Sequence, residues 1–267
     1  LYKFQHEGGG FSLWGPGGDD PSDYGSKPEP WLSAWVLWTL AEAERQGYAV
    51  DKNVRDSGAA YLAASLKERM RTSGVESPAA ELAEKAQVAY VLAALGKPVP
   101  SIASFLYDRR ADLPVFAKAF LAHAMHLANG DRARISALVA DIVKAARPVD
   151  DGVRFADVPT KDMWRLRHTD VRTNSIVLSA LTAIAPDHAL TAKVARGLLD
   201  AREDGRWLHT QENAYALLGL SEYFKGKEKS ARLDVTAKIG DKVIHDGPAP
   251  GAKPFWSATL PFAAAEA

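Results

Sequence analysis

One motif recurs along this chain: a glycine-rich or acidic turn that contains an aromatic residue, followed by an apolar segment of helical length. It occurs at residues 8–15, 150–158 and 203–220, with the sequences GGGFSLWG, DDGVRFADV and EDGRWLHTQENAYALLGL. The glycine permits a tight turn, and the aromatic residue can pack against the helix that follows. Self-similarity of this kind indicates a fold built from repeated helical hairpins.

The segments near these turns have the spacing and the end signals of helices. Residues 31–47 place apolar side chains at three- and four-residue steps, with Pro30 at the start and Gly47 at the end. Asp51 and Thr210 are candidate N-caps. Further helices are expected at residues 51–66, 78–95, 101–110, 114–128, 131–146, 170–184, 190–202 and 211–224. The pattern predicts roughly nine helices joined by short links.

Two mainly α architectures accommodate such repeats. One is a closed α/α toroid, a ring of helical hairpins like that of terpenoid cyclases, and the other is an open superhelix of helix pairs. The large aromatic turns and the irregular repeat length favour the ring.

The end of the chain has a different pattern. Residues 233–239 alternate as LDVTAKI, Gly240-Asp241 can form a turn, and residues 242–245 and 255–262 are also strand-like. The Lys- and Glu-rich residues 225–229 are a plausible boundary. We therefore expect the toroid over residues 1–228, and over residues 229–267 a few strands that begin a β-sandwich-type domain.

Composition excludes several function classes. The chain has 33 Lys and Arg against 33 Asp and Glu, so nothing indicates a nucleic-acid partner. It has no cysteine, which excludes disulfides, thiolate zinc sites and a cysteine nucleophile within these 267 residues. No apolar run approaches the roughly 20 residues that span a bilayer, so we expect no membrane span in this segment.

Residue patterns give no catalytic or metal site. His123 and His126 share one helix but have no carboxylate partner at zinc-site spacing, so we expect a packed or surface histidine pair. Asp19, Asp20 and Asp23 lie among glycines and prolines, which is typical of a solvated loop. We expect no metal, no cofactor and no enzymatic activity.

Aromatic residues in or beside the repeated turns are the remaining candidates. They could line a pocket at one end of a ring, or they could simply fill the ends of the hairpins. They are Phe11, Trp14, Trp31, Trp35, Trp164 and Trp207.

Several ordered blocks of the sequence resemble the thioester-containing domain of bacterial α2-macroglobulins. They are GGGFSLWG, EPWLSAWVLWTLAEAERQGYAVD, AYVLAALGK, LPVFAKAFLAHAMHLANGD, RTNSIVLSALTAIAP and GRWLHTQENAYALLGLSEYF. The resemblance covers residues 1–225 and is specific because the blocks agree in order. It implies an α/α toroid, followed by the start of a macroglobulin-like or CUB-like domain.

The resemblance also implies a function. Members of this family are broad-spectrum endopeptidase inhibitors: a protease cuts a bait region elsewhere in a large chain, and the protein collapses around it. An internal Cys–Gln thioester then reacts with a lysine of the protease. The implied partners are target proteases and the neighbouring macroglobulin-like domains. The implied location is the periplasm, with an inner-membrane anchor through a lipoprotein N-terminus outside this segment.

The chain departs from the family pattern at the reactive bond itself. The family's Cys-x-x-Glu-Gln motif belongs in helices before Leu1, and these residues contain no cysteine. Either the motif precedes Leu1 in a longer protein, or the protein belongs to a branch without the thioester. Aromatic side chains that keep water from the thioester are the role that the resemblance transfers here. Trp14, Trp31, Trp207 and Tyr215 are the candidates for this shielding pocket.

Two other functions remain open from the sequence. One is a toroid carbohydrate-active enzyme, a polysaccharide lyase or a glycosidase, although spacing reveals no pair of catalytic carboxylates. The other is a purely structural or interaction domain of a relative without the thioester.

Overall fold

The computed structural model describes residues 1–16, 25–67, 78–157, 163–228 and 234–248. The chain divides into two compact units, Leu1–Tyr223 and Phe224–Ala267. Every helix expected from the sequence is present. The α-helices are α1 (Pro30–Arg45), α2 (Lys52–Ser65), α3 (Pro78–Ala94), α4 (Pro100–Asp108), α5 (Val115–Leu127), α6 (Arg132–Lys144), α7 (Asp170–Ile184), α8 (Ala189–Asp200) and α9 (Thr210–Glu228), and the short 3-10 helices are η1 (Tyr2–Phe4), η2 (Arg110–Asp112) and η3 (Met163–Leu166).

Local sequence signals explain where the helices begin. The Asp51 side chain accepts a hydrogen bond from the Asn53 amide at 2.8 Å, which confirms the predicted cap of α2. The Asp131 and Thr169 side chains cap α6 and α7 in the same way. Thr210 is itself the first residue of α9, not the residue before it.

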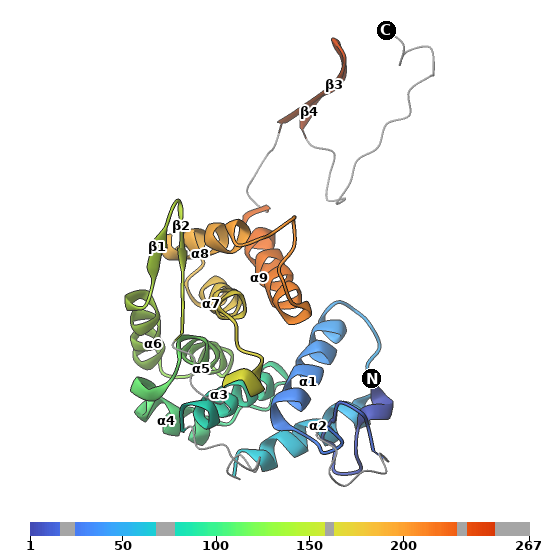
Figure 1. Cartoon of the computed structure of the whole chain (residues 1–267), viewed down its shortest axis with the longest axis vertical. Coiled ribbons are helices and arrows are strands. Elements are labelled where there is room, and N and C mark those ends of the chain that lie inside the picture. Colours follow the sequence, from blue (N-terminus) through green and yellow to red (C-terminus); the bar gives the residue numbers. More distant parts are fainter. Residues whose placement is uncertain (17–24, 68–77, 158–162, 229–233, 249–267) are drawn as a thin grey trace. The chain divides into compact units, whose positions relative to one another are not determined.

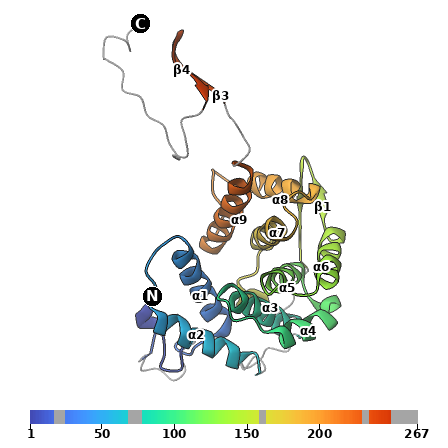
Figure 2. The ribbon, with the colours of Figure 1, turned by 180° about the vertical axis from the view of Figure 1, so that it is seen from behind.

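The helices of the first unit alternate between two layers. The odd-numbered helices α1, α3, α5 and α7 pack on one another in order, and each is covered by the even-numbered helix that follows it. Figures 1 and 2 show this arrangement from both sides. The unit is therefore mainly helical, with the inner and outer layers expected of an α/α toroid.

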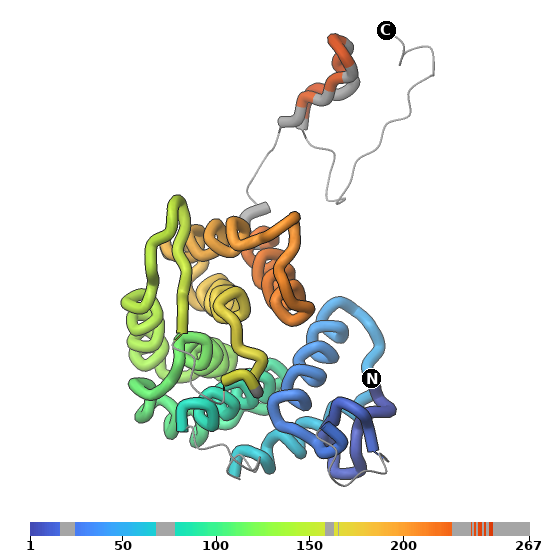
Figure 3. Tube along the Cα trace, viewed as in Figure 1, coloured from blue at the N-terminus to red at the C-terminus, as the bar shows by residue number. Residues whose placement is uncertain are grey.

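Alanine is the main reason that the inner helices come so close together. α3 buries five alanines and α5 buries four, so the two backbones can approach without large side chains between them. Figure 3 traces the chain as it passes repeatedly from the inner layer to the outer layer and back.

A short hairpin was not expected from the sequence. Residues 150–158 were predicted only as a turn, but β1 (Arg147–Val149) and β2 (Gly152–Arg154) form an antiparallel pair around this turn. Three-residue strands are too short to show alternation, and Pro148 argues against a strand. Gly152 lies directly against the α8 backbone, where an added Cβ would be 2.6 Å from the Gly197 nitrogen.

The second unit contains an antiparallel pair, β3 (Asp234–Ile239) and β4 (Lys242–Pro248), joined through Gly240 at a φ of +56°. The register shifts between Ala237 and Lys238. The predicted strands at 233–239 and 242–245 are thus confirmed, whereas residues 255–262 lie outside the described residues. The assignment of residues 229–267 to a β-sandwich-type domain stays a prediction. None of the helices in the described part of the chain combines the length and the apolar character needed to cross a bilayer.

Candidate functional site

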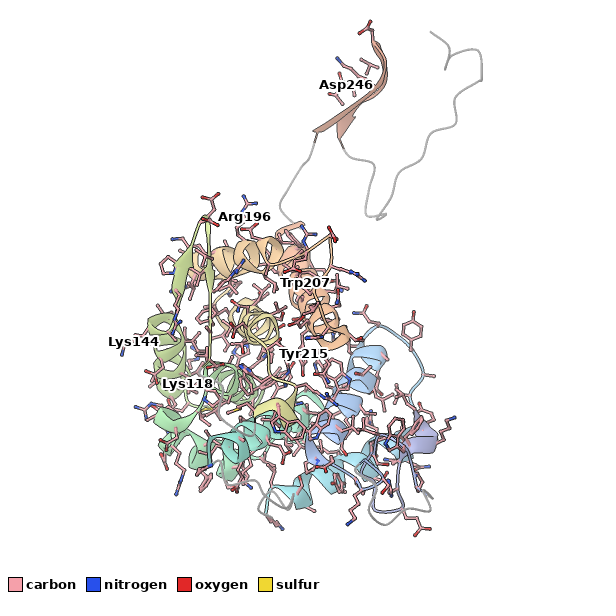
Figure 4. All side chains as sticks on the ribbon, in the orientation of Figure 1. Lys118, Lys144, Arg196, Trp207, Tyr215 and Asp246 are labelled. Carbon is pink, nitrogen blue, oxygen red and sulfur yellow. The ribbon has the colours of Figure 1, made fainter. Side chains whose placement is uncertain are left out.

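The four aromatic residues proposed as a shield lie in different environments. Trp14 is 67% exposed, whereas Trp31, Trp207 and Tyr215 are buried. The Trp207 indole Nε1 donates to the Leu198 carbonyl at 3.0 Å, so this ring secures the turn between α8 and α9. Figure 4 labels Trp207 near this turn and Tyr215 on α9.

Tyr215 contacts two tryptophans of α1, stacked on Trp38 and tilted against Trp35. Its ring centroid lies 4.7 Å from that of Trp38, with 18° between the ring planes, and 4.8 Å from that of Trp35. The two tryptophan rings are 5.2 Å apart. We call these three residues the α1–α9 aromatic stack, because they join α9 to α1 through their side chains.

The structure therefore brings only one of the four predicted residues into an aromatic cluster. Among the described residues, no ring contact joins Trp14, Trp31 or Trp207 to Tyr215. Trp38 was not singled out from the sequence, although its three-residue spacing from Trp35 puts both rings on one face of a helix. The shielding role of the four residues stays a prediction.

A second cluster begins at the start of α7, where four consecutive polar residues are buried. Arg172, Thr173, Asn174 and Ser175 are each at most 4% exposed. A run of buried polar residues is unusual, because each polar group must find a hydrogen-bond partner within the protein. The letters RTNS in the sequence were the available signal, but a sequence pattern alone cannot distinguish a buried polar run from an exposed one.

Arg172 is the centre of this cluster. Its Nη2 donates to Gln87 Oε1 of α3 at 3.1 Å. Its guanidinium carbon lies 5.2 Å from the ring centroid of Phe116, 5.8 Å from that of Phe120 and 5.1 Å from that of Tyr215. These distances are those of cation–π contacts. Side chains from α3, α5, α7 and α9 thus converge on one buried cation, and we call this set the Arg172 cluster.

α3 also fixes the start of α1. The Gln87 amide Nε2 donates to the Trp31 carbonyl at 3.4 Å, and the buried Glu84 carboxyl forms a hydrogen bond with the Trp31 backbone. Burial raises the pKa of Glu84 to about 8, with the neighbouring Glu29 charge contributing to the rise. Glu84 is therefore mostly protonated at neutral pH.

His168 contacts the Arg172 cluster through Phe116 of α5. Arg167 has a left-handed φ of 52°, and His168, the next residue, stacks on Phe116 with the ring centroids 5.3 Å apart. Burial lowers the pKa of His168, and the Arg172 charge acts in the same direction, whereas Asp157 opposes it. The ring is thus biased toward its neutral form.

The other residues considered from the sequence lie apart from this cluster or outside the described residues. The His123 ring packs at a tilt against Tyr90, with the ring centroids 4.9 Å apart, and burial lowers its pKa to about 4, as expected of a packed histidine. Asp19, Asp20 and Asp23 lie outside the described residues. Within the described ranges, no group of three or more His, Asp or Glu side chains could hold a metal ion.

The chemistry of the Arg172 cluster is that of binding. It offers guanidinium N–H donors and aromatic faces, and Arg172 is held by the Gln87 hydrogen bond and by the ring contacts. Such a cluster can fix the relative positions of inner helices and can hold an acceptor group.

Comparison with known proteins places this geometry in context. No protein-family model matches the chain. The chain is 27% identical over 222 residues to α2-macroglobulin of Escherichia coli strain K12, a match that covers 80% of this chain and 12% of that protein. The resemblance expected from the sequence is thereby confirmed.

Solved structures support the same fold. The native conformation of E. coli α2-macroglobulin matches with a TM-score of 0.67 and 23% identity, over 92% of this chain and 14% of that chain. E. coli α2-macroglobulin activated by porcine elastase matches with a TM-score of 0.65 and 23% identity, over 93% of this chain and 21% of that chain. The match to α2-macroglobulin of E. coli K12 covers only about one eighth of the length of that protein.

Proposed function

Because this chain is related to the bacterial α2-macroglobulins, we propose that it is the helical-ring segment of a protease-trapping inhibitor. The observation that carries the proposal is the sequence match to E. coli α2-macroglobulin over 80% of the chain. The fold match to the same protein activated by porcine elastase supports proteases as partners. Trapping is a property of a whole inhibitor, so this segment would act together with the neighbouring domains of a longer protein.

The finer part of the proposal concerns the thioester. The ring would carry or shield the region of a Cys–Gln thioester, and burial among apolar side chains would slow its hydrolysis by excluding water. Tyr215 is the favoured shielding residue, because it is buried in the α1–α9 aromatic stack. Trp31 and Trp207 follow because they are buried, and Trp14 is the weakest of the four because it is largely exposed.

The proposed setting is the periplasm, with an inner-membrane anchor through a lipoprotein N-terminus outside this segment. This setting follows from the family resemblance alone. Fractionation of cells that produce the full-length protein, with palmitate labelling to detect a lipid anchor, tests it directly.

A trapping assay on the full-length protein tests the main proposal. The protein is mixed with porcine elastase, and residual protease activity is measured on a small chromogenic peptide and on a large protein such as casein. A trap leaves cleavage of the peptide largely intact and strongly reduces cleavage of casein, because only the small substrate reaches the enclosed protease. Equal retention of both activities contradicts trapping, and equal loss of both indicates an active-site inhibitor instead.

Methylamine separates a thioester-bearing inhibitor from a relative without the thioester. A small amine opens a thioester, so radioactive methylamine should enter the full-length protein in a ratio of about one per chain. A protein that traps elastase but incorporates no methylamine belongs to the branch without the thioester. In a thioester-bearing protein, Tyr215→Ala should speed spontaneous loss of methylamine reactivity, whereas Tyr48→Ala, at an exposed tyrosine, should not.

A further inference from the structure

Arg172 is a buried charge without a counter-ion among the described residues. Its side chain is 1% exposed, and no ion pair of the described residues includes it. Its Nε and Nη1 atoms have no hydrogen-bond partner. A buried charge costs much more free energy than a buried neutral group unless an opposite charge accompanies it.

The three buried polar residues that follow Arg172 in α7 find hydrogen-bond partners within the protein. Thr173 Oγ1 donates to Asp157 Oδ2 at 3.2 Å, and Ser175 Oγ donates to the Val171 carbonyl at 2.7 Å. The Asn174 side chain bonds both the amide and the carbonyl of Phe155. Of the four buried polar residues at the start of α7, only Arg172 retains donors without a partner, and close to it the buried His168 Nδ1 also lacks one.

The titratable groups near Arg172 do not supply the missing negative charge. Glu84, which is linked to it through Gln87, is held mostly protonated by burial. Burial also raises the pKa of Tyr215, so the hydroxyl stays neutral although the Arg172 charge and a side-chain hydrogen bond with Arg172 oppose the shift. Asp157 carries a negative charge that acts on the nearby His168, but among the described residues it forms no ion pair with Arg172, and its two carboxylate oxygens accept hydrogen bonds from Val115 and Thr173.

The side chains around Arg172 limit which group could bind to its guanidinium. Phe116, Phe120 and Tyr215 lie within cation–π distance of the guanidinium, and only its Nε and Nη1 atoms are without a hydrogen-bond partner. A water molecule would satisfy an N–H group but would not balance the charge, whereas an anion does both. Because Arg172 is almost completely buried, an anion of one or a few atoms is favoured over a bulky organic acid.

We propose that the first unit binds a small monovalent inorganic anion, such as chloride, at the free N–H edge of Arg172. The anion neutralises the buried guanidinium and so stabilises the junction of α3, α5, α7 and α9. The site belongs to the ring itself and does not depend on the proposed protease trap.

Hydrogen exchange on the full-length protein gives a local test. Amide exchange is followed by mass spectrometry in peptides from the first half of α7 and from α3, in sodium chloride and in sodium gluconate of equal ionic strength. Gluconate is too large to enter a closed site. We expect amide exchange in these peptides to be several-fold slower in chloride than in gluconate. An anion that binds only the folded state lowers the population of locally opened states from which the amides exchange. Peptides from the second unit should exchange equally in both salts.

Two variants and a control make the test specific to Arg172. Gln87→Glu keeps the size of the side chain but places a carboxylate beside the guanidinium, so it should abolish the chloride effect without removing Arg172. Arg172→Met should abolish it as well. Arg196→Gln, at an exposed position of α8, should retain the full effect (Figure 4). The Gln87→Glu variant keeps the test decisive if Arg172→Met fails to fold.

Crystals of the protein grown in bromide provide an independent readout. Anomalous scattering should reveal a bromide ion within hydrogen-bond distance of Arg172 Nε or Nη1. The proposal is overturned if wild-type exchange is the same in chloride and gluconate, or if the chloride effect survives in both Gln87→Glu and Arg172→Met. Bromide found only at surface positions would also overturn it.

Discussion

Glu84 on α3 and Arg172 on α7 are both buried in the first unit. Arg172 bonds Gln87, Gln87 bonds the Trp31 carbonyl, and Glu84 bonds the Trp31 backbone. Burial has opposite consequences for Glu84 and Arg172. The Glu84 carboxyl escapes the cost of burial by staying protonated, since its pKa rises to about 8. A guanidinium cannot lose its proton at any physiological pH, so Arg172 keeps its charge wherever it lies.

Glu84 and Arg172 therefore need different surroundings inside the same helical unit, because one is neutral and the other is charged. The region around Glu84 needs only a hydrogen bond, which the Trp31 backbone provides. The region around Arg172 needs aromatic faces, an amide oxygen and a counter-charge. The variants below test this contrast, in order of decreasing expected effect.

Phe116→Ala should have the largest effect. The Phe116 ring is fully buried and contacts both Arg172 and His168, so truncation leaves a cavity and removes a cation–π contact. We expect a loss of about 3–5 kcal/mol in the free energy of unfolding, measured by urea denaturation. Phe105→Ala is the control, since Phe105 is 38% exposed and lies beneath Arg109 on the surface. Equal losses in the two variants would contradict the central role of Phe116.

Gln87→Leu should come next. It removes the acceptor for Arg172 Nη2 and the donor to the Trp31 carbonyl, and it leaves both groups buried. The expected loss is about 2–3 kcal/mol, measured in the same way. Gln46→Leu, at an exposed glutamine after α1, should change stability by less than about 0.5 kcal/mol. A Gln87→Leu protein as stable as the wild type would show that Arg172 does not depend on this amide.

The raised pKa of Glu84 leads us to expect that the free energy of unfolding decreases as pH rises. Its pKa is higher in the folded state than in the unfolded chain, so the folded state binds the extra proton and stability falls as pH rises. Between about pH 6.5 and pH 8 we expect the free energy of unfolding to fall by about 1–2 kcal/mol from this group. The Glu84→Gln protein should lose this part of the slope.

His123 sets the lower limit of the window for that measurement. Its pKa is lowered from about 6.5 to about 4 in the folded state, so the unfolded chain binds the proton more readily and the free energy of unfolding falls as pH drops from about 6.5 toward 4. Above about pH 6.5 it no longer contributes, because neither state holds the proton. An unchanged slope in Glu84→Gln above this pH would refute the assignment to Glu84.

Arg45→Gln should have the smallest effect. Arg45 pairs with Glu42 of α1 and with Glu222 of α9, but its side chain is half exposed. An exposed ion pair contributes at most about 1 kcal/mol and is weakened by salt. The difference from wild type should therefore shrink in 1 M salt. A large, salt-independent loss would mean that this pair, and not the aromatic stack, joins α1 to α9.

Much of the fold could be predicted because its signals are local. Apolar periodicity, the Asp51 cap and the glycine after α1 depend on residues close together in the chain, and the helices lie where these signals put them. The β1–β2 hairpin was missed because its strands are only three residues long. Its position depends on the close approach of Gly152 to Gly197, which are 45 residues apart.

The candidate site was only partly predictable. Tyr215 was singled out from its place after an aromatic turn, but its partners Trp35 and Trp38 lie about 180 residues earlier in the chain. No pattern within a window of sequence reports which aromatic ring will stack on which. The Arg172 cluster was missed for the same reason, since its members come from α3, α5, α7 and α9.

The amino-acid sequence was enough to predict a series of helical hairpins, and its ordered blocks indicated a resemblance to the bacterial α2-macroglobulin family. Helix propensity, capping and apolar spacing act over a few residues, so they can be read in chain order. The burial of the polar run at residues 172–175 became evident only from the tertiary structure. The same is true of the missing hydrogen-bond partners of Arg172 Nε and Nη1. Burial and electrostatic environment arise from residues that meet in space, and distant segments meet only once the ring has formed.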